Sequence, residues 1–365
     1  MNKLYKTVAF SVLLAGNCTN AFAENEADID KLMDLSLKEL TQIEVTSVSK
    51  RAEKANETAA AISVITAEDI RRSGATTVPE VLRGIPGVQV ARINAGWWAI
   101  TARGNANQFG NKLLVLLDGR SIYNPMFSGA SWEEQGTPLE DIERIEVIRG
   151  PGATLWGANA VNGVINITTK NSKDTEGNLL AAGAGDFDGF SGYARHGGKL
   201  GEDATYRSYL NHYSQNNSET GTGIAAYDDW QISRAGTRVD GKIDEAANYT
   251  ISSDVYSGTR NLPFMKVPEI SGARTKVDLD KQDMYGGNLI TKYSRKISED
   301  SNLDVQAYYD YVGRDAEIFG HNIQTFDFDA QNTFNLTDNH EFIVGAGYRL
   351  VDAEMDKSIL IRYPY

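Results

Sequence analysis

A glycine-rich run between two β-prone segments is the first part of the sequence whose residue types could do chemistry. The run Gly150-Pro151-Gly152-Ala153-Thr154-Leu155-Trp156-Gly157 lies inside the segment 144–170. A phosphate-binding loop of the Walker kind needs Gly-Lys-Ser/Thr leading into a helix whose N-terminal amides face the phosphate. The run has no lysine, and residues 161–169 are rich in Val, Ile and Thr. We therefore expect glycines that permit tight reversals between strands, and no bound nucleotide.

Side chains that could bind a metal or act as nucleophiles are scattered along the chain. The four histidines, His196, His212, His321 and His340, form no close pair, and the single cysteine is Cys18. Zinc-type sites need several such ligands close together. No Ser-His-Asp set is recognisable either. The sequence predicts a protein that is not an enzyme and holds no metal or cofactor of its own.

The charge balance and the N-terminus limit the class of protein. The formal net charge is −13, whereas neutralising nucleic-acid phosphates needs clustered Lys and Arg, so we exclude DNA and RNA partners. Residues 1–23 combine lysines, an apolar segment and Ala21-Phe22-Ala23, which indicates a secretory signal peptide. The mature chain would then contain no cysteine. This fits a large exported fold that is stabilised by backbone hydrogen bonds between strands and not by disulfides.

Residues 24–57 read as an exported arm, and residues 58–170 as a compact domain. The arm is charged, with one amphipathic helix and a β-prone segment at 43–49 that is either a linker or a binding strand. The domain alternates short strands with short helices, and Thr66 and Thr77 each begin a predicted capping box. Asp118-Gly119 predicts a tight turn. The domain is an α+β unit of a size that can fold alone.

From residue 171 to residue 365 the helix signals disappear and side chains alternate with a period of two. Phe326 and Phe328 alternate with Asp327 and Asp329, residues 303–311 repeat the pattern, and weaker copies lie at 247–255, 284–293 and 342–350. Each is near the ~10 residues that a tilted strand needs to cross a bilayer. Short polar connections alternate with long ones at 214–226, 257–283 and 312–323. This pattern favours a transmembrane β-barrel over a soluble sandwich or propeller, whose strands are usually shorter.

Five motifs between residues 84 and 167 resemble, in order and spacing, the plug domain of TonB-dependent outer-membrane receptors. They are Gly84-Ile85-Pro86-Gly87-Val88, Ala102-Arg103-Gly104, Leu116-Leu117-Asp118-Gly119-Arg120, the run IERIEVIRGP at 142–151 and the run GANAVNGVINI at 157–167. Specific motifs carry the resemblance over residues 43–170. After residue 170 only the pattern of strands and connections resembles that of the family. It implies an α+β plug domain followed by antiparallel transmembrane β-barrel strands, in a barrel of about 22 strands within the lipid of the cell outer membrane.

The resemblance also implies roles for two sets of residues. Glu44-Val45-Thr46-Ser47-Val48 looks like the TonB box, an exposed segment that adds a strand to the sheet of TonB, the periplasmic energy-transducing protein. Arg103 and Arg149 match two plug arginines that, in relatives, pair with barrel-wall glutamates and lock the plug in place. Solvated positions at strand ends are the alternative for both arginines.

Three loops match the apical loops that plugs of this family present to the outside. They are residues 94–98, 107–111 and 122–129. Aromatic side chains there suit large planar or catecholate ligands, but they suit packing inside the plug equally well. The candidate ligand-binding residues are Asn94, Trp97, Trp98, Phe109, Tyr123 and Phe127.

The function implied by the resemblance is TonB-dependent active transport of a scarce ligand across the outer membrane. The leading candidate ligand is a ferric siderophore or other iron complex, followed by cobalamin, haem or a carbohydrate. A passive pore and a barrel enzyme are the rival classes, and a lumen filled by a folded domain argues against the pore. We count about nine strand candidates after residue 170, fewer than half of what such a barrel needs. We therefore expect a fragment or a truncated reading frame that transports nothing by itself.

Overall fold

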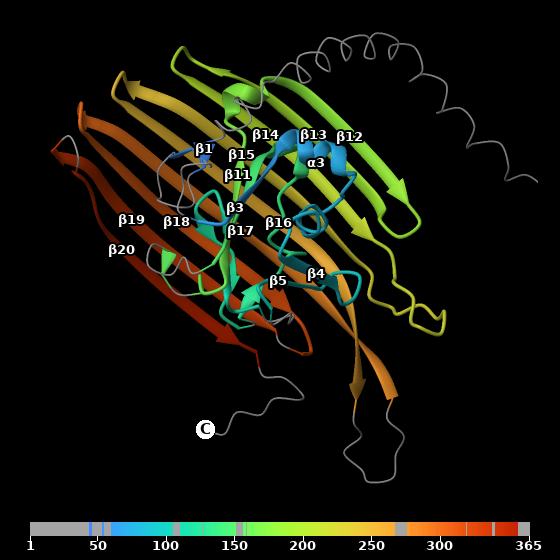
Figure 1. Ribbon diagram of the computed structural model, residues 1–365. Helices are drawn as coiled ribbons and strands as arrows, with labels where there is room; N and C mark the ends of the chain where they lie inside the picture. Colours follow the sequence, from blue (N-terminus) through green and yellow to red (C-terminus); the bar gives the residue numbers. More distant parts are fainter. Residues whose placement is uncertain are drawn as a thin grey trace, which may run out of the picture. The chain divides into compact units, whose positions relative to one another are not determined.

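The computed structural model describes residues 44–45, 53–54, 60–104, 110–126, 128–150, 156–157, 159–266, 276–318, 320–337 and 340–356. The chain divides into two compact units, residues 1–59 and residues 60–365. In the first unit, β1 (Glu44–Val45) pairs antiparallel with β2 (Glu53–Lys54). The second unit holds the remaining elements (Figure 1). No helix in these segments is long and apolar enough to cross a membrane.

Residues 60–170 of the second unit fold as the predicted α+β domain, which we call the plug. Its five-stranded sheet has the order β3-β10-β11-β6-β7, in which β11 runs parallel to β6 and the other pairs are antiparallel. The strands are β3 (Ile62–Thr66), β6 (Leu113–Leu117), β7 (Arg120–Ser121), β10 (Ile142–Arg149) and β11 (Gly163–Thr169). Two hairpins complete it: β4 (Val88–Arg92) with β5 (Trp98–Ala102), and β8 (Tyr123–Asn124) with β9 (Gly129–Ala130).

The glycine-rich run connects two antiparallel neighbours. Arg149 at the end of β10 lies opposite Gly163 at the start of β11, and the Gly150 amide donates to the Asn162 carbonyl at 2.9 Å. A Cβ on Gly163 would lie 2.3 Å from the carbonyl oxygen of Ile148, so any other residue there would push the backbone of β10 and β11 apart. The predicted strand–reversal–strand order is confirmed, because β11 rather than a helix follows the run.

Two short helices, α3 (Ala67–Ser73) and α4 (Val78–Leu82), follow β3. The capping box predicted at Thr66 is present: its hydroxyl accepts from the Asp69 amide at 3.2 Å, and Asp69 accepts from the Thr66 amide at 2.9 Å. The box predicted at Thr77 is wrong, because Thr77 makes no capping hydrogen bond. The carboxylate of Glu80 instead accepts from the amide and the hydroxyl of Thr76, one residue earlier.

The core of the plug lies between the five-stranded sheet and the two helices. Asp118 and Gly119 have φ of 49° and 83°, which closes the predicted tight turn between β6 and β7. Of two short 3₁₀ turns, η1 (Leu139–Asp141) precedes β10 and η2 (Ser172–Thr175) follows β11. The buried cluster contains Ile70, Val78, Val81, Leu82, Ile85, Trp98, Ile100, Ala102, Leu113, Val115, Leu117, Ile122, Ile142, Ile145, Val147, Ile165 and Ile167.

The chain after η2 forms one sheet of nine consecutive antiparallel strands, which we call the wall. The predicted loops 257–283 and 312–323 are shorter in the structure, because backbone pairing continues past the alternating segments, as far as Lys266 opposite Lys276. The strands are β12 (Gly177–Gly185), β13 (Gly189–Leu200), β14 (Ala204–Gln215), β15 (Trp230–Asp244), β16 (Ala247–Lys266), β17 (Lys276–Ser298), β18 (Ser301–Asp315), β19 (His321–Thr337) and β20 (His340–Met355).

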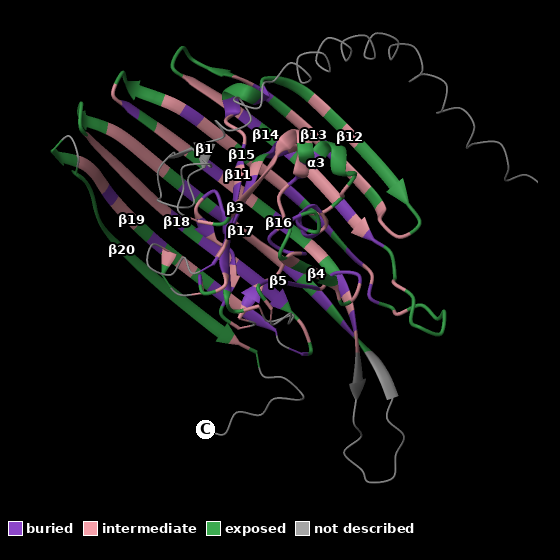
Figure 2. Ribbon diagram, viewed as in Figure 1, coloured by how far each residue is buried: buried purple, intermediate pink, exposed green. Residues whose placement is uncertain are grey.

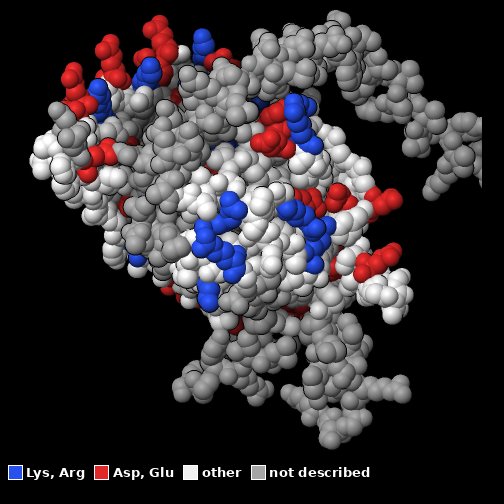
Figure 3. All heavy atoms as spheres, viewed as in Figure 1, with Lys and Arg blue, Asp and Glu red and all other residues white. Residues whose placement is uncertain are grey.

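The two faces of the wall differ, as the alternation predicts. On β19, Phe326 and Phe328 are exposed while Asp327 and Gln331 are buried on the side that the plug covers, so buried and exposed bands alternate along the strands (Figure 2). One end of the wall, the turn end, carries only short connections, whereas the other, the loop end, carries the short connection 186–188 and the longer ones 216–229, 267–275 and 316–320. Charged side chains gather on the turns (Figure 3). Apolar residues outward and polar residues inward are the arrangement of a transmembrane β-barrel wall.

Candidate functional site

Several contacts between the plug and the wall are made by buried ionised side chains. Four carboxylates of the plug face arginines of the wall, and each of the four residues is at most 9% exposed. Burying a charge is costly unless it is paired and hydrogen-bonded, so such contacts fix the position of the plug in one geometry. The carboxylates are Asp118, Glu133, Glu134 and Asp141, and the arginines are Arg195, Arg207, Arg238, Arg260 and Arg314.

The most buried of these contacts is a cluster that we call the acid latch: Glu133, Glu134, Arg260 and Arg314. Arg260 Nη1 lies 2.6 Å from Glu133 Oε1, and Arg314 Nη2 lies 3.2 Å from the same oxygen. Arg314 Nε donates to Glu134 Oε1 at 2.8 Å. Arg234 of β15 donates to the backbone carbonyl of Glu134. The loop between β9 and η1 is therefore tied to three wall strands, β15, β16 and β18.

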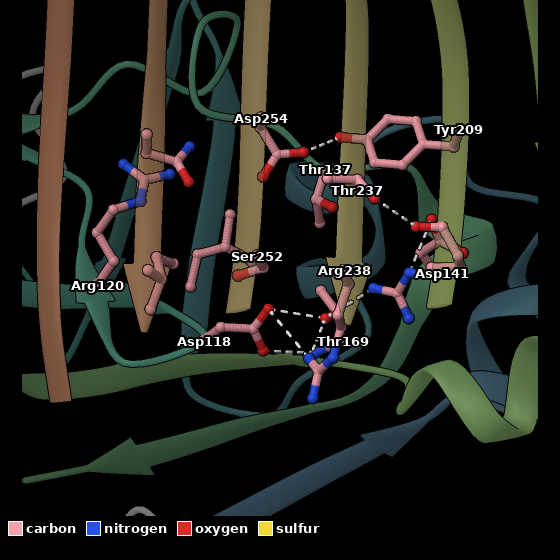
Figure 4. A pocket seen from close by; sticks show the side chains of 14 residues that line it. Asp118, Arg120, Thr137, Asp141, Thr169, Tyr209, Thr237, Arg238, Ser252 and Asp254 are labelled. Carbon is pink, nitrogen blue, oxygen red and sulfur yellow. Dashed lines mark hydrogen bonds and ion pairs between the residues drawn. The ribbon is translucent and has the colours of Figure 1, made fainter. Parts of the chain in front are cut away.

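A small polar pocket lies between the plug and the middle of the wall (Figure 4). In it, Asp118 accepts from the amide and hydroxyl of Thr169 at 2.9 and 2.7 Å and lies 3.7 Å from Arg238 Nη1. Burial raises the pKa of the Asp118 carboxyl, but Lys292, Arg238 and the bonds from Thr169 outweigh it and bring the pKa below its ordinary value. The enclosed volume is about 20 Å³, room for one or two waters.

Two further ion pairs hold the plug on either side of this pocket. Arg120 Nη1 of the plug lies 2.9 Å from Asp310 Oδ1 of β18, and in this pair the plug supplies the cation. Asp141 Oδ1 lies 2.7 Å from Arg195 Nη1 of β13. Arg207 of β14 also donates to the Lys170 carbonyl, so the end of the plug and the start of the wall are joined where the chain passes from one to the other.

At the loop end, the tip of the β4–β5 hairpin is held by the wall. The Ala95 amide donates to Asp228 Oδ2 at 2.8 Å, and Trp230 Nε1 donates to the Ala95 carbonyl at 3.0 Å. A Cβ on Gly96 would lie 3.3 Å from the Trp230 ring, so the contact is close. The guanidinium of Arg260 lies 4.3 Å from the centre of the Trp97 ring, which links this tip to the acid latch through a cation–π contact.

The residues predicted to bind the ligand lie in different environments. Asn94 Oδ1 accepts from the Gly96 and Trp97 amides and so shapes the hairpin tip. Trp97 and Tyr123 are half-buried, whereas Trp98 is 6% exposed and packs in the plug core. Phe109 and Phe127 lie outside the described residues. The structure thus brings Asn94 and Trp97 together at one tip, and their ligand-binding role stays a prediction.

The predicted lock and TonB-binding residues remain predictions as well. Arg149 donates to the Pro86 carbonyl at 2.6 Å and to Ser63 Oγ at 3.1 Å, both within the plug. Arg103 is exposed, with φ of 60°. Neither arginine pairs with a carboxylate in the part of the chain that the structure describes. Glu44 and Val45 are extended in β1, and Thr46, Ser47 and Val48 fall outside the described residues.

Sequence reasoning did not find the acid latch or the other wall arginines. The signal available was weak: adjacent acids in Trp132-Glu133-Glu134-Gln135, and arginines at inward-facing positions of the alternating strands. A folded domain pinned by buried ion pairs to the polar face of long antiparallel strands, whose other face is apolar, defines a plugged receptor of the outer membrane.

Comparison with known proteins agrees with this class. Residues 54–164 match the family described as TonB-dependent Receptor Plug Domain. The chain is 33% identical over 144 residues to the vitamin B12 transporter BtuB of Vibrio cholerae serotype O1, covering 40% of this chain and 23% of the transporter. It is 33% identical over 190 residues to BtuB of Photobacterium profundum, which covers 51% of this chain and 28% of that transporter.

Solved structures share the fold. The ferripyoverdine receptor of Pseudomonas aeruginosa superimposes with a TM-score of 0.69 at 14% identity, over 88% of this chain and 46% of that one. The ferric-catecholate import receptor Fiu of E. coli K12 superimposes with a TM-score of 0.62 at 15% identity, over 83% of this chain and 50% of that one. The chain thus spans about half the length of these receptors. Residues 54–164 are thus a plug domain of the TonB-dependent receptors, and the described chain has the fold of outer-membrane receptors of this kind.

Proposed function

We propose that this chain is the plug and part of the barrel wall of a receptor that takes up a scarce ligand across the outer membrane, using energy relayed through TonB. The observation that carries the proposal is the plug held against the polar face of the wall by buried ion pairs. A folded domain anchored in this way obstructs a passive pore. It also has to be moved before a ligand can pass, which requires an input of energy.

An iron complex such as a ferric siderophore is the first ligand candidate. In support, the half-buried Trp97 lies at the loop end, which long connections mark as the outer side of a barrel. An aromatic surface there suits a ligand with planar groups. Cobalamin is the second candidate, and the 33% identity to vitamin B12 transporters favours it. Competitive binding of a ferric catecholate, a ferric hydroxamate and cyanocobalamin to the full-length receptor separates the two candidates.

The proposed TonB contact is strand addition by residues 44–48. The extended backbone of Glu44–Val45 in β1 supports it, because strand addition uses main-chain hydrogen bonds. Proline has no amide hydrogen and cannot donate to a ladder, whereas alanine can. In cells that make the full-length receptor, Val45→Pro should abolish uptake of whichever of these probes binds, and Val45→Ala should retain it. Equal uptake by both variants would remove residue 45 from the contact, and binding at the cell surface should be the same in both.

A further inference from the structure

One buried carboxylate joins a loop of the wall to the tip of the plug. Asp228 lies in the loop 216–229, between β14 and β15, and is 2% exposed. Its Oδ2 accepts from the Ala95 amide of the plug at 2.8 Å. The same carboxylate accepts from Ser218 at the other end of the loop, from the amide at 2.7 Å and from the hydroxyl at 2.6 Å. Asp228 therefore holds the two ends of the loop and the plug tip at one point.

The arrangement of these three donors explains why residue 228 is a carboxylate. All three are neutral N–H or O–H groups, and their distances of 2.6–2.8 Å are those of hydrogen bonds to a charged acceptor. The two amides use different oxygens: Oδ1 accepts from Ser218 and Oδ2 from Ala95. An asparagine would offer one oxygen and one NH₂ group in these places, so it could not accept from both amides. The link between the loop and the plug therefore depends on the carboxylate.

The backbone next to Asp228 is held in a conformation that is costly for its residue type. Tyr227 has φ of 55°, in the left-handed region that residues other than glycine rarely adopt. Packing of the ring does not account for this conformation, because Tyr227 is 55% exposed. Strained backbone persists where its surroundings over-determine it, and it is concentrated at binding sites. The hydrogen bonds of Asp228 provide such a constraint one residue away.

The plug tip that Asp228 holds is closed on itself and carries Trp97. The Ile93 amide donates to the Trp97 carbonyl at 2.8 Å, and Asn94 Oδ1 accepts from the Trp97 amide at 2.7 Å. Ala95 lies between these bonded residues in the sequence. A displacement of Ala95 would therefore move Trp97 with it, so the bond from Ala95 to Asp228 sets the position of the Trp97 side chain.

We infer that Asp228 is a positioning residue of the ligand site. It fixes the tip that carries Trp97 against the loop 216–229 before a ligand arrives, so that two segments of the receptor meet the ligand together. A site that is already in its binding conformation binds more tightly, because less conformational entropy is lost on binding. The inference rests on the proposed function, and it adds that the loop 216–229 belongs to the ligand site and that one carboxylate sets its geometry.

The test compares Asp228→Asn with its matched control Asp229→Asn in cells that make the full-length receptor. Asp229 lies in the same loop, and its side chain accepts from Asn261 of β16 at 3.0 Å. Uptake of a radiolabelled ferric catecholate and of radiolabelled cyanocobalamin is measured over a range of concentrations. Losing a hydrogen bond to a charged group shifts an equilibrium about ten-fold or more, so Asp228→Asn should raise the half-saturating concentration by that factor and leave the maximal rate within about two-fold. Asp229→Asn should change neither quantity.

A role in folding alone would give the opposite result. Fewer folded receptors would lower the maximal rate and leave the half-saturating concentration unchanged, and that outcome in Asp228→Asn would overturn the inference. A second variant loosens the tip without altering the carboxylate: Trp230 Nε1 donates to the Ala95 carbonyl at 3.0 Å, and Trp230→Phe removes this donor. The loss of one neutral hydrogen bond should raise the half-saturating concentration about three-fold or more. No rise in this variant would likewise overturn the inference.

Hydrogen exchange in the purified full-length receptor tests the contact without any ligand. The amides of Ala95 and Ser218 donate to the two oxygens of Asp228, so they exchange only when the contact opens. Because asparagine can accept from only one of them, at least one amide should exchange about ten-fold faster in Asp228→Asn than in the wild type. Equal rates for both amides in these two proteins would overturn the inference. Absence of energy-dependent uptake by the wild type would instead count against the proposed function alone.

Discussion

Replacing Arg314 with methionine tests whether the acid latch holds the plug to the wall. Arg314 contacts Glu133 and Glu134, and all three side chains are at most 2% exposed. Removing one partner of a buried ion pair typically costs about 3–5 kcal/mol, because the remaining charge is left uncompensated. At about 1.4 kcal/mol per factor of ten, the equilibrium constant for local opening should rise roughly 100- to 4,000-fold.

Hydrogen exchange in the full-length receptor measures this opening directly. The amides of Glu134 and Gln135 donate to the Ser131 carbonyl at 3.1 and 2.9 Å, so they exchange only when the loop opens. Arg295→Met is the control: its pair with Asp244 spans 3.3 Å, and the side chains are 42% and 46% exposed. Such a pair contributes at most about 1 kcal/mol. If both variants left exchange at Glu134 and Gln135 unchanged, the latch would not hold the plug.

Three further predictions concern the plug. The pKa of the Asp118 carboxyl is lowered in the folded protein. Its carboxylate should therefore stabilise the plug fully above the ordinary pKa of about 3.9 and lose that effect as the pH falls through the pKa of the folded state. The difference in melting temperature between the wild type and Asp118→Asn should shrink below about pH 4. Ile145→Ala, at a fully buried position, should cost about 2–5 kcal/mol in denaturant unfolding, whereas Val161→Ala, at a plug position that is 52% exposed, should cost less than about 0.5 kcal/mol. Thr66→Ala should cost about 1 kcal/mol through its lost cap, whereas Thr77→Ala should cost little, because its hydroxyl makes no hydrogen bond.

The elements of this fold follow from local patterns that the sequence displays. The alternation around Phe326 and Asp327 predicts both the strand and which face is polar, since the side-chain period of a strand is two. The cap at Thr66 likewise needs only Asp69, three residues on. Where two backbone stretches go on pairing without that alternation, as up to Lys266 and Lys276, the sequence underestimates strand length.

The contacts that fix the plug are not local and could not be predicted. Glu133 and Arg260 are 127 residues apart, and Glu134 and Arg314 are 180 apart. Their meeting depends on the register of the wall and on how the plug docks, neither of which leaves a short-range signal. The environment of Trp98 was also not predicted from the sequence. Its place beside an apical loop suggests a ligand contact, but Trp98 lies in the plug core because β5 is buried throughout.

We propose that the receptor whose wall holds this plug takes up its ligand in an energy-dependent way. The most direct measurement is accumulation of a radiolabelled iron complex and of radiolabelled cyanocobalamin by cells with the full-length receptor, before and after the proton gradient is collapsed. We expect the bound amount at the surface to stay constant while accumulation stops. Accumulation that continues at the same rate without the gradient would show an open pore, and would contradict the account.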